Sequence, residues 1–256
     1  MSLTYEERRL TILNHLELEG KVQVPHMAEL LSVSTETVRR DLDRLEKEGM
    51  LRKVYGGAVK MRMDRVEPPF QKRVEMMRPE KRAIGKLAAS LVEDGETIML
   101  DNGTTTIEII PFLSDKPNVT LIINSVPMLM LAMETFQGRI LFTGGEVNRE
   151  CRATMGPLAD QMLDQFKVNK AFISGGGVSV TDGITDFHME EAMVARKMMQ
   201  RAEETILVVD HSKFGMSTFA RVARLKDISM LVTDPGCSKE WIETFEGLGI
   251  EVRISE

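Results

Sequence analysis

An alternation of short β-rich runs with helical patterns limits the fold of residues 80–256 more than any other feature of the sequence. The runs are ETIMLD, VTLIIN, RILFTG, KAFISG, TILVVD, ISMLVTD and IEVRIS. Most of them precede a stretch with helical periodicity, such as IEIIPFL, VPMLMLAMETF, PLADQMLDQF, MEEAMVARKMMQRAE or KEWIETFEGLG. Strands that alternate with helices form βαβ units. The pattern therefore predicts an α/β domain with a doubly wound, mostly parallel sheet.

Polar and glycine-rich segments follow these strands, and they read DNGTTT, NS, TGGE, SGGG, DHSKFG and TD. Ligands of open α/β sheets bind outside the carboxyl ends of the strands. We therefore expect a small polar ligand at this edge of the sheet. The candidate ligand-binding residues, taken from these segments and from the start of the helix near residue 190, are Asp101, Gly103, Thr104, Thr105, Thr106, Asn124, Gly144, Gly145, Gly175, Gly176, Glu191 and Lys213.

The segment DNGTTT (residues 101–106) is suited to an anion. It follows a strand and opens a helix, so its backbone N–H groups and threonine hydroxyls can surround an oxyanion, and Gly103 would allow close approach. Lys213 could supply a cation to the same ligand. An ordinary strand-to-helix turn capped by threonine gives the same pattern, and the other glycines could simply make turns. Likewise, Glu191 could bond hydroxyl groups of a ligand or only favour the start of its helix.

Residues 4–49 carry three helical patterns. The third is preceded by Ser34, a suitable N-cap, and places Val38, Leu42 and Leu45 at positions i, i+4 and i+7. The segment MLRKVYGGAV that follows predicts two short strands joined by a Gly-Gly turn. Three helices and a small β-wing together predict an N-terminal winged helix-turn-helix.

A DNA recognition helix buries one stripe and presents short polar and cationic side chains to the bases and phosphates. With the apolar stripe of residues 34–48 turned inward, the opposite side of the helix is available to DNA. A solvated three-helix bundle would carry similar charges, and Arg40 beside Asp41 could belong to a structural ion pair. The candidate DNA-binding residues of the helix and wing are Ser34, Thr35, Thr37, Arg39, Arg40, Arg44, Arg52, Lys53 and Tyr55.

The length of 256 residues favours two domains of unequal size. Pro68, Pro69 and Pro79 interrupt a polar stretch, so we expect a DNA-binding domain over 1–60, a linker over 61–79 and an α/β sensor domain over 80–256. The net charge is -6, yet residues 1–78 hold 15 Lys and Arg against 13 Asp and Glu. The charge distribution therefore permits a DNA-facing N-terminal part.

Several classes of protein are disfavoured. No apolar stretch is long enough for a membrane span, and the N-terminus MSLTYEERRL lacks the order of a signal peptide, so we expect a cytoplasmic protein without a membrane partner. Cys151 and Cys237 belong to no CxxC pair, and the four histidines show no metal-ligand spacing. No GxxxxGK[ST] or GxGxxG motif is present. We expect neither a metal nor a cofactor.

The segment SVSTETVRRDLDRLEKEGMLRKVYGGAV resembles, with high specificity, the N-terminal domain of the DeoR family of bacterial regulators of sugar metabolism. The segments EKRAIGKLAASLVEDGETIMLDNGTTT, INS, TGGE, SGGG, GITDFHMEEA and VVDHSKFG resemble the sensor domain of the same family. The resemblance implies a sensor fold similar to that of sugar-phosphate isomerases of the ribose-5-phosphate isomerase type. It implies operator DNA and a phosphorylated sugar as partners, in a homo-oligomer that we expect to be a dimer or tetramer.

The sequence favours a regulator over an enzyme. The resembling isomerases carry paired aspartates in the loop that here reads SGGGV, so no acid stands there to move a proton between sugar carbons. We therefore expect a non-enzymatic repressor of a sugar transport or catabolism operon, with operator binding modulated by the sugar phosphate. The alternatives are an isomerase fused to a DNA-binding domain, with Asp182, Asp186 and Glu191 near the pocket, and an adaptor that binds proteins through its helical domain.

Overall fold

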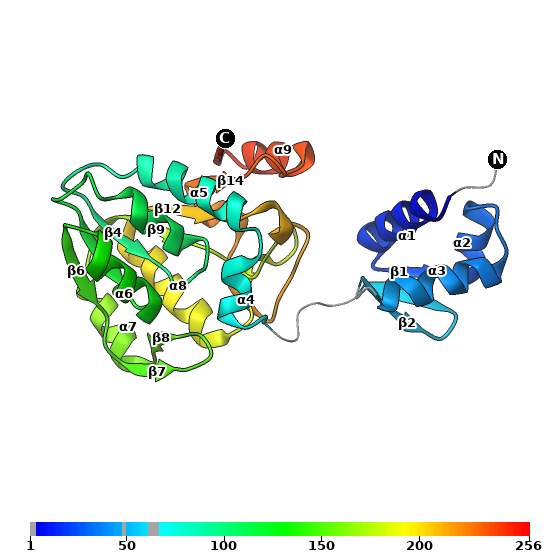
Figure 1. The fold of residues 1–256 in the computed structure, drawn as a ribbon, viewed down its shortest axis with the longest axis horizontal. Helices are drawn as coiled ribbons and strands as arrows, with labels where there is room; N and C mark the ends of the chain where they lie inside the picture. Colours follow the sequence, from blue (N-terminus) through cyan, green and yellow to red (C-terminus); the bar gives the residue numbers. More distant parts are fainter. Residues whose placement is uncertain (1–3, 48–49, 61–66) are drawn as a thin grey trace. The chain divides into compact units, whose positions relative to one another are not determined.

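The computed structural model describes residues 4–47, 50–60 and 67–256. The chain divides into two compact units, Met1–Met63 and Asp64–Glu256, and Figure 1 shows the elements of each. Within the described residues, no helix is both long and apolar enough to cross a membrane.

Three helices and three strands make up the first unit: α1 (Tyr5–Glu19), β1 (Lys21–Gln23), α2 (Val24–Leu30), α3 (Thr35–Lys47), β2 (Leu51–Val54) and β3 (Gly57–Lys60). Thr4 caps α1 in a capping box with Glu7, and Gly20 ends that helix in the left-handed conformation. Ser34 caps α3, because its Oγ accepts a hydrogen bond of 3.1 Å from the Thr37 backbone N–H. The core includes Val38, Leu42 and Leu45, as the periodicity predicts.

The wing is the antiparallel hairpin of β2 and β3, joined through Tyr55 and Gly56. Strand β1 pairs with the other edge of β3, giving the order β1-β3-β2. A Cβ at Gly57 would lie 2.0 Å from the Val22 carbonyl oxygen, so the glycine allows this pairing. The predicted winged helix-turn-helix is confirmed, with one strand more than the sequence indicates.

Seven parallel strands form the central sheet of the second unit, in the order β15-β14-β12-β9-β4-β5-β6. All seven predicted strands are present: β4 (Thr97–Leu100), β5 (Thr120–Ile123), β6 (Arg139–Phe142), β9 (Val168–Ile173), β12 (Ala202–Val208), β14 (Met230–Thr233) and β15 (Glu251–Ile254). The helices that connect or follow them are α5 (Arg78–Ser90), the 3-10 helix η1 (Thr106–Phe112), α6 (Val126–Thr135), α7 (Pro157–Leu163), α8 (Met189–Arg201) and α9 (Lys239–Gly247). The predicted doubly wound α/β fold is confirmed.

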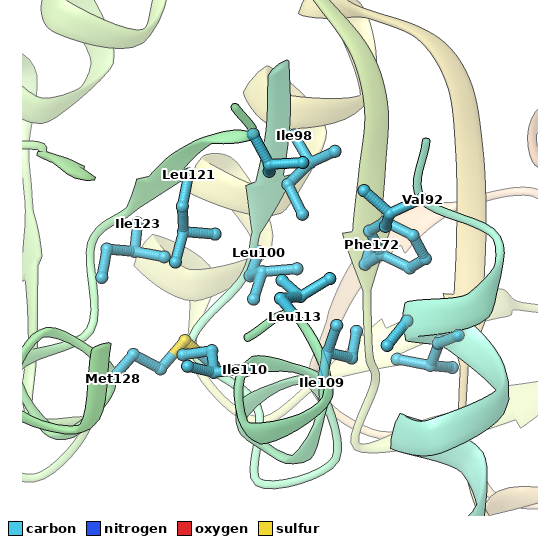
Figure 2. Packing of buried hydrophobic residues seen from close by; sticks show 14 of the residues in the cluster. Val92, Ile98, Leu100, Ile109, Ile110, Leu113, Leu121, Ile123, Met128 and Phe172 are labelled. Atoms are coloured by element: carbon cyan, nitrogen blue, oxygen red, sulfur yellow. The ribbon is translucent and has the colours of Figure 1, made fainter. Parts of the chain in front are cut away.

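Both faces of the sheet are buried, since alternate residues of one strand enter different clusters. Ile98 and Leu100 of β4 pack against α5, η1 and α6, whereas Met99 between them packs against α7 and α8. Figure 2 shows the first of these clusters, including Ile109, Ile110, Leu113, Leu121, Ile123, Met128 and Phe172. Full burial of such a side chain contributes about 1.5–3 kcal/mol. The core thus holds the carboxyl ends of the strands in fixed positions.

Short antiparallel strands that the sequence does not indicate lie outside the central sheet. β7 (Glu146–Asn148) pairs with β8 (Ala153–Met155), and β10 (Gly177–Ser179), β11 (Gly183–Asp186) and β13 (Ala220–Ala223) form a three-stranded sheet. Two further 3-10 helices are η2 (His211–Lys213) and η3 (Leu225–Asp227). These strands read EVN, ATM, GVS, GITD and ARVA, which are neither apolar runs like most strands of the central sheet nor long enough for a clear period of two.

The expected linker over 61–79 needs correction in its second half. Residues 61–66 lie outside the described part of the chain, but Phe70–Glu75 form helix α4, and α5 already begins at Arg78. Phe70 is buried, and Pro79 occupies the first turn of α5, where its missing N–H is not needed. The prolines here start helices and do not mark an extended linker.

Candidate anion-binding site and nucleic-acid interface

The Asp101 carboxylate holds the loop 101–106 against the end of β9. It accepts hydrogen bonds from the Ser174 N–H at 2.6 Å, the Gly103 N–H at 3.0 Å and the Thr106 hydroxyl at 2.9 Å. Burial raises the pKa of this carboxyl, and the hydrogen bonds oppose the shift. Asp101 and Thr106, both predicted to bind ligand, thus fix the shape of the loop.

Gly103 is required by the protein itself. A Cβ at this position would lie 2.0 Å from the Ser174 Oγ. We predicted that this glycine lets a ligand approach the backbone, but the close neighbour in the structure is a side chain of the next strand.

The start of η1 leaves hydrogen-bond donors available. Within the described residues, the backbone N–H groups of Thr104, Thr105 and Thr106 have no acceptor. The Thr104 Oγ1 accepts a hydrogen bond of 2.9 Å from the Lys81 Nζ. Three consecutive amides beside a buried ammonium are the donors that an oxyanion would need, so this loop is the candidate anion site.

Lys81 is a site residue that the sequence did not reveal. It is buried on α5 in the same stripe as Ile84, Gly85 and Ala88, and its Nζ also donates to the Arg73 carbonyl at 2.5 Å. Burial lowers the pKa of Lys81 to about 8, although Asp210 opposes the shift. A lysine at i, with apolar residues at i+3, i+4 and i+7, was the available signal, because such stripes normally exclude charges.

The predicted cation, Lys213, belongs to the same neighbourhood. It lies in η2, which Asp210 caps through the Ser212 N–H at 3.0 Å. Its charge lowers the pKa of Lys81 and opposes the rise in the pKa of Glu67. Because the charge of Lys213 disfavours that of Lys81, a dianion close to both would be favoured.

Carboxyl groups converge at the other end of the same loop. The Asn102 amide donates to Glu191, and carboxylate oxygens of Glu67, Asp186 and Glu191 all lie within 4.8 Å of one another. Arg73 pairs with Glu67 at 2.8 Å. Glu191 was predicted as a ligand residue, whereas Glu67 was not, because it lies far from the other two in sequence.

Donors for a cation are present in two overlapping sets. Besides the three carboxyls, Cys151, His188 and Glu191 offer ligand atoms within 4.8 Å of one another. Burial raises the pKa of the Cys151 thiol, and the charge of Glu191 adds to the shift. Either set could hold an ion by its donor chemistry, so the expected absence of a metal stays a prediction.

The remaining predicted ligand residues have local roles in the structure. The Asn124 amide donates to the Thr154 carbonyl at 3.1 Å and so holds β8, and it shares no hydrogen bond with residues 101–106 within the described residues. Gly144 is exposed, Gly145 has a φ of +131°, and a Cβ at Gly175 or Gly176 would meet Ile184 or Phe187. Their binding of a ligand stays a prediction.

On helix α3 the predicted DNA-binding side chains face solvent. Thr35, Arg39 and Arg40 are exposed, and Thr37 is partly buried under its hydrogen bond to Ser34. The sequence left open that Arg40 forms a structural ion pair with a neighbouring helix. In the structure the adjacent Asp41 forms such a pair, since its carboxylate accepts hydrogen bonds of 2.6 and 3.0 Å from Arg8 of α1. Arg40 is therefore available to a phosphate.

Two other cations of this unit have protein neighbours. Arg44 lies over the Tyr5 ring, with 4.0 Å from its Cζ to the ring centroid, so it also stabilises the contact between α1 and α3. Lys53 pairs with Asp43. At the wing tip Tyr55 is fully exposed, while the side chain of Arg52 lies outside the described part of the structure.

A winged helix-turn-helix whose third helix presents exposed arginines, joined to a separate α/β unit, is typical of a DNA-binding regulator. The DeoR-like helix-turn-helix domain matches residues 8–62, and the DeoR C-terminal sensor domain matches residues 77–235. The chain belongs to the DeoR family of transcriptional regulators, as its sequence motifs predict.

Curated relatives are similar in sequence to this protein over nearly the whole chain. The transcriptional repressor GlcR of Bacillus subtilis is 32% identical over 251 residues, which is 98% of this chain and 96% of that protein. The transcriptional repressor AccR of Agrobacterium fabrum is 34% identical over 241 residues, 93% of either chain. These relatives are regulators, and the chain is correspondingly a regulator and not an enzyme.

Solved structures are similar to only part of this chain. Ribose 5-phosphate isomerase A from Methanocaldococcus jannaschii shares 24% identity over 54% of this chain and 55% of that chain, with a TM-score of 0.39. We transfer no site residue from it.

The carboxyl cluster predicts a pH-dependent stability. Burial and neighbouring acids raise the pKa of Glu191 to about 7 and that of Asp186 to about 8. The folded protein therefore keeps protons that the unfolded chain releases, and its free energy of unfolding falls as the pH rises from about 4.5 to 8. Glu191→Gln should raise that free energy by about 1–3 kcal/mol at pH 8.5 and change it little at pH 4.

Urea unfolding followed by the fluorescence of Trp241, the single tryptophan, checks this prediction. The control is Glu190→Gln, which removes an exposed acid from the same helix. An equal effect of Glu191→Gln at both pH values would contradict it.

Proposed function

We propose that the chain represses an operon for the transport or catabolism of a sugar, and that a phosphorylated sugar bound in the second unit modulates its affinity for the operator. The observation that carries the proposal is the group of unpaired amides of residues 104–106 beside Lys81. A phosphate dianion would accept from the amides and offset the charges of Lys81 and Lys213. The carboxyls around Glu191 and the Asn102 amide would bond the sugar.

The hydrogen bonds of Lys81 offer a route from the ligand towards the DNA-binding unit. Its Nζ joins Thr104 to the Arg73 carbonyl. Arg73 in turn holds Glu67 and donates to the Pro68 carbonyl at 3.1 Å. In the sequence, residues 61–66 connect the wing to Glu67 and Pro68. A ligand that reorients Lys81 would therefore act on the residues that directly follow this connecting segment. The ligand must bind the DNA-competent and DNA-incompetent states with different affinities.

A panel of sugar phosphates tests the proposal. Thermal shift identifies a stabilising compound, and fluorescence anisotropy then measures the affinity for DNA from upstream of the operon, with and without that compound at fixed salt. Light scattering of the same sample measures the oligomeric state, which we propose to be a homodimer or homotetramer. A stabilising compound that leaves the DNA affinity unchanged would refute the switch.

A further inference from the structure

The carboxyls of Glu67, Asp186 and Glu191 form a cluster next to the loop 101–106. They come from three separate segments: the residue before Pro68, the end of β11 and the first turn of α8. Their oxygens lie within 4.8 Å of one another. Arg73 pairs with Glu67 at 2.8 Å, and His188 Nε2 lies 3.4 Å from the same carboxylate.

Glu191 offers an acceptor that the protein does not use. The residue is 6% exposed. One carboxylate oxygen accepts from the Asn102 amide, while the buried Oε2 has no hydrogen-bond partner among the described residues. A buried carboxylate oxygen without a donor is costly, so this atom indicates a ligand that donates.

The acidic cluster and the anion site are the two ends of one loop. Asn102 bonds Glu191, and Thr104, two residues further on, bonds Lys81. The Cα atoms of two such residues are about 7 Å apart or less. A ligand that lies along this loop meets ammonium groups and free amides at one end and carboxyls at the other.

We propose that the effector is an amino sugar phosphate, whose ammonium group binds between Glu67, Asp186 and Glu191 while its phosphate binds at Lys81 and residues 104–106. The inference rests on the proposed function and names the class of sugar. An ammonium group that donates to three oxygens at about 2.8 Å each holds them about 4.6 Å apart, which is compatible with the separations in the cluster.

The charge of the ligand distinguishes this class from neutral sugars. A hydroxyl group can donate to the Glu191 Oε2 but leaves the mutual repulsion of the three carboxylates in place. An ammonium group donates and offsets that repulsion, so it favours the ionised form of the cluster. An N-acetyl group removes the charge and adds bulk, so it should bind less well than the free amine.

Calorimetric titration of the full chain compares glucosamine 6-phosphate and galactosamine 6-phosphate with their parent sugar phosphates and N-acetyl derivatives. The amine is expected to bind at least about tenfold more tightly than its parent, as a charge-assisted hydrogen bond allows. In Glu191→Gln the preference should shrink to about threefold or less, while the parent compound still binds. Asp186→Asn should act in the same direction, and Glu190→Gln should keep the full preference.

The outcomes separate the two proposals. If a parent sugar phosphate binds as tightly as its amine, the ammonium site is refuted and the proposed function stands. If none of these compounds binds, the inference is refuted, and the wider panel of sugar phosphates then decides whether the proposed function stands. If Mn²⁺ or Zn²⁺ alone stabilises the wild type but not Glu191→Gln, the cluster is a metal site and the ammonium assignment is wrong.

Discussion

A chain carrying Lys81→Met is expected to bind its operator with normal affinity but to lose its response to the sugar phosphate. The Lys81 Nζ is the buried cation next to the unpaired amides, and it bonds Thr104 at 2.9 Å. Loss of a hydrogen bond from a charged donor to a phosphate costs about 1.5–3 kcal/mol, or a roughly 10- to 150-fold weaker ligand. Methionine fills a similar volume and removes a buried charge, so the fold should be kept.

The pH dependence gives a second measurement for the same residue. Because burial lowers the pKa of Lys81 to about 8, the unliganded protein loses this charge above that pH. A phosphate favours the charged form, so binding must then take up a proton, and the affinity of the wild type should fall as the pH rises above 8. In Lys81→Met the affinity should be low throughout and lack this decline.

Lys86→Met is the matched control, since Lys86 lies on the same helix with its side chain exposed. It should leave both operator binding and the response to the ligand unchanged. If Lys81→Met binds the sugar phosphate as the wild type does, the anion site lies elsewhere.

The fold could be predicted from the sequence because its signals are local. The seven sheet strands are short apolar runs, and all were found. Ser34 and the stripe of Val38, Leu42 and Leu45 marked α3 in the same way. The strands outside the central sheet, such as β1, β7 and β10, were missed because they have only three or four residues and contain no apolar run.

The site could be predicted only in part, because its side chains are assembled by tertiary structure. The loop 101–106 and Lys213 follow strands and were found. Glu67 and Asp186 enter the site from segments more than one hundred residues apart, and no periodicity connects them. Lys81 could have been recognised in the sequence as a charged residue within an apolar stripe. Asp101 and Gly103 were predicted to bind ligand, and in the structure they shape the loop.

The double variant Arg39→Ala/Arg40→Ala is expected to weaken operator binding strongly at physiological salt. Both side chains are exposed on α3, and neither is needed by the core. Each contact of this kind to a base or phosphate contributes about 1–3 kcal/mol, so the pair should weaken binding by roughly 30-fold or more. Arg44 is less suitable for the test, because it also packs on Tyr5.

Anisotropy titrations over a range of salt concentrations measure the effect. Each lost phosphate contact should reduce the slope of log K against log salt by about 1. Lys21→Ala, which removes an exposed cation from β1, outside α3 and the β2–β3 wing, controls for the general charge of the unit and should change affinity only slightly. Circular dichroism should show that the double variant keeps its helices. If its affinity equals that of the wild type, α3 does not read the operator. If the wild type itself shows no salt-dependent binding to DNA, the helical unit binds proteins instead.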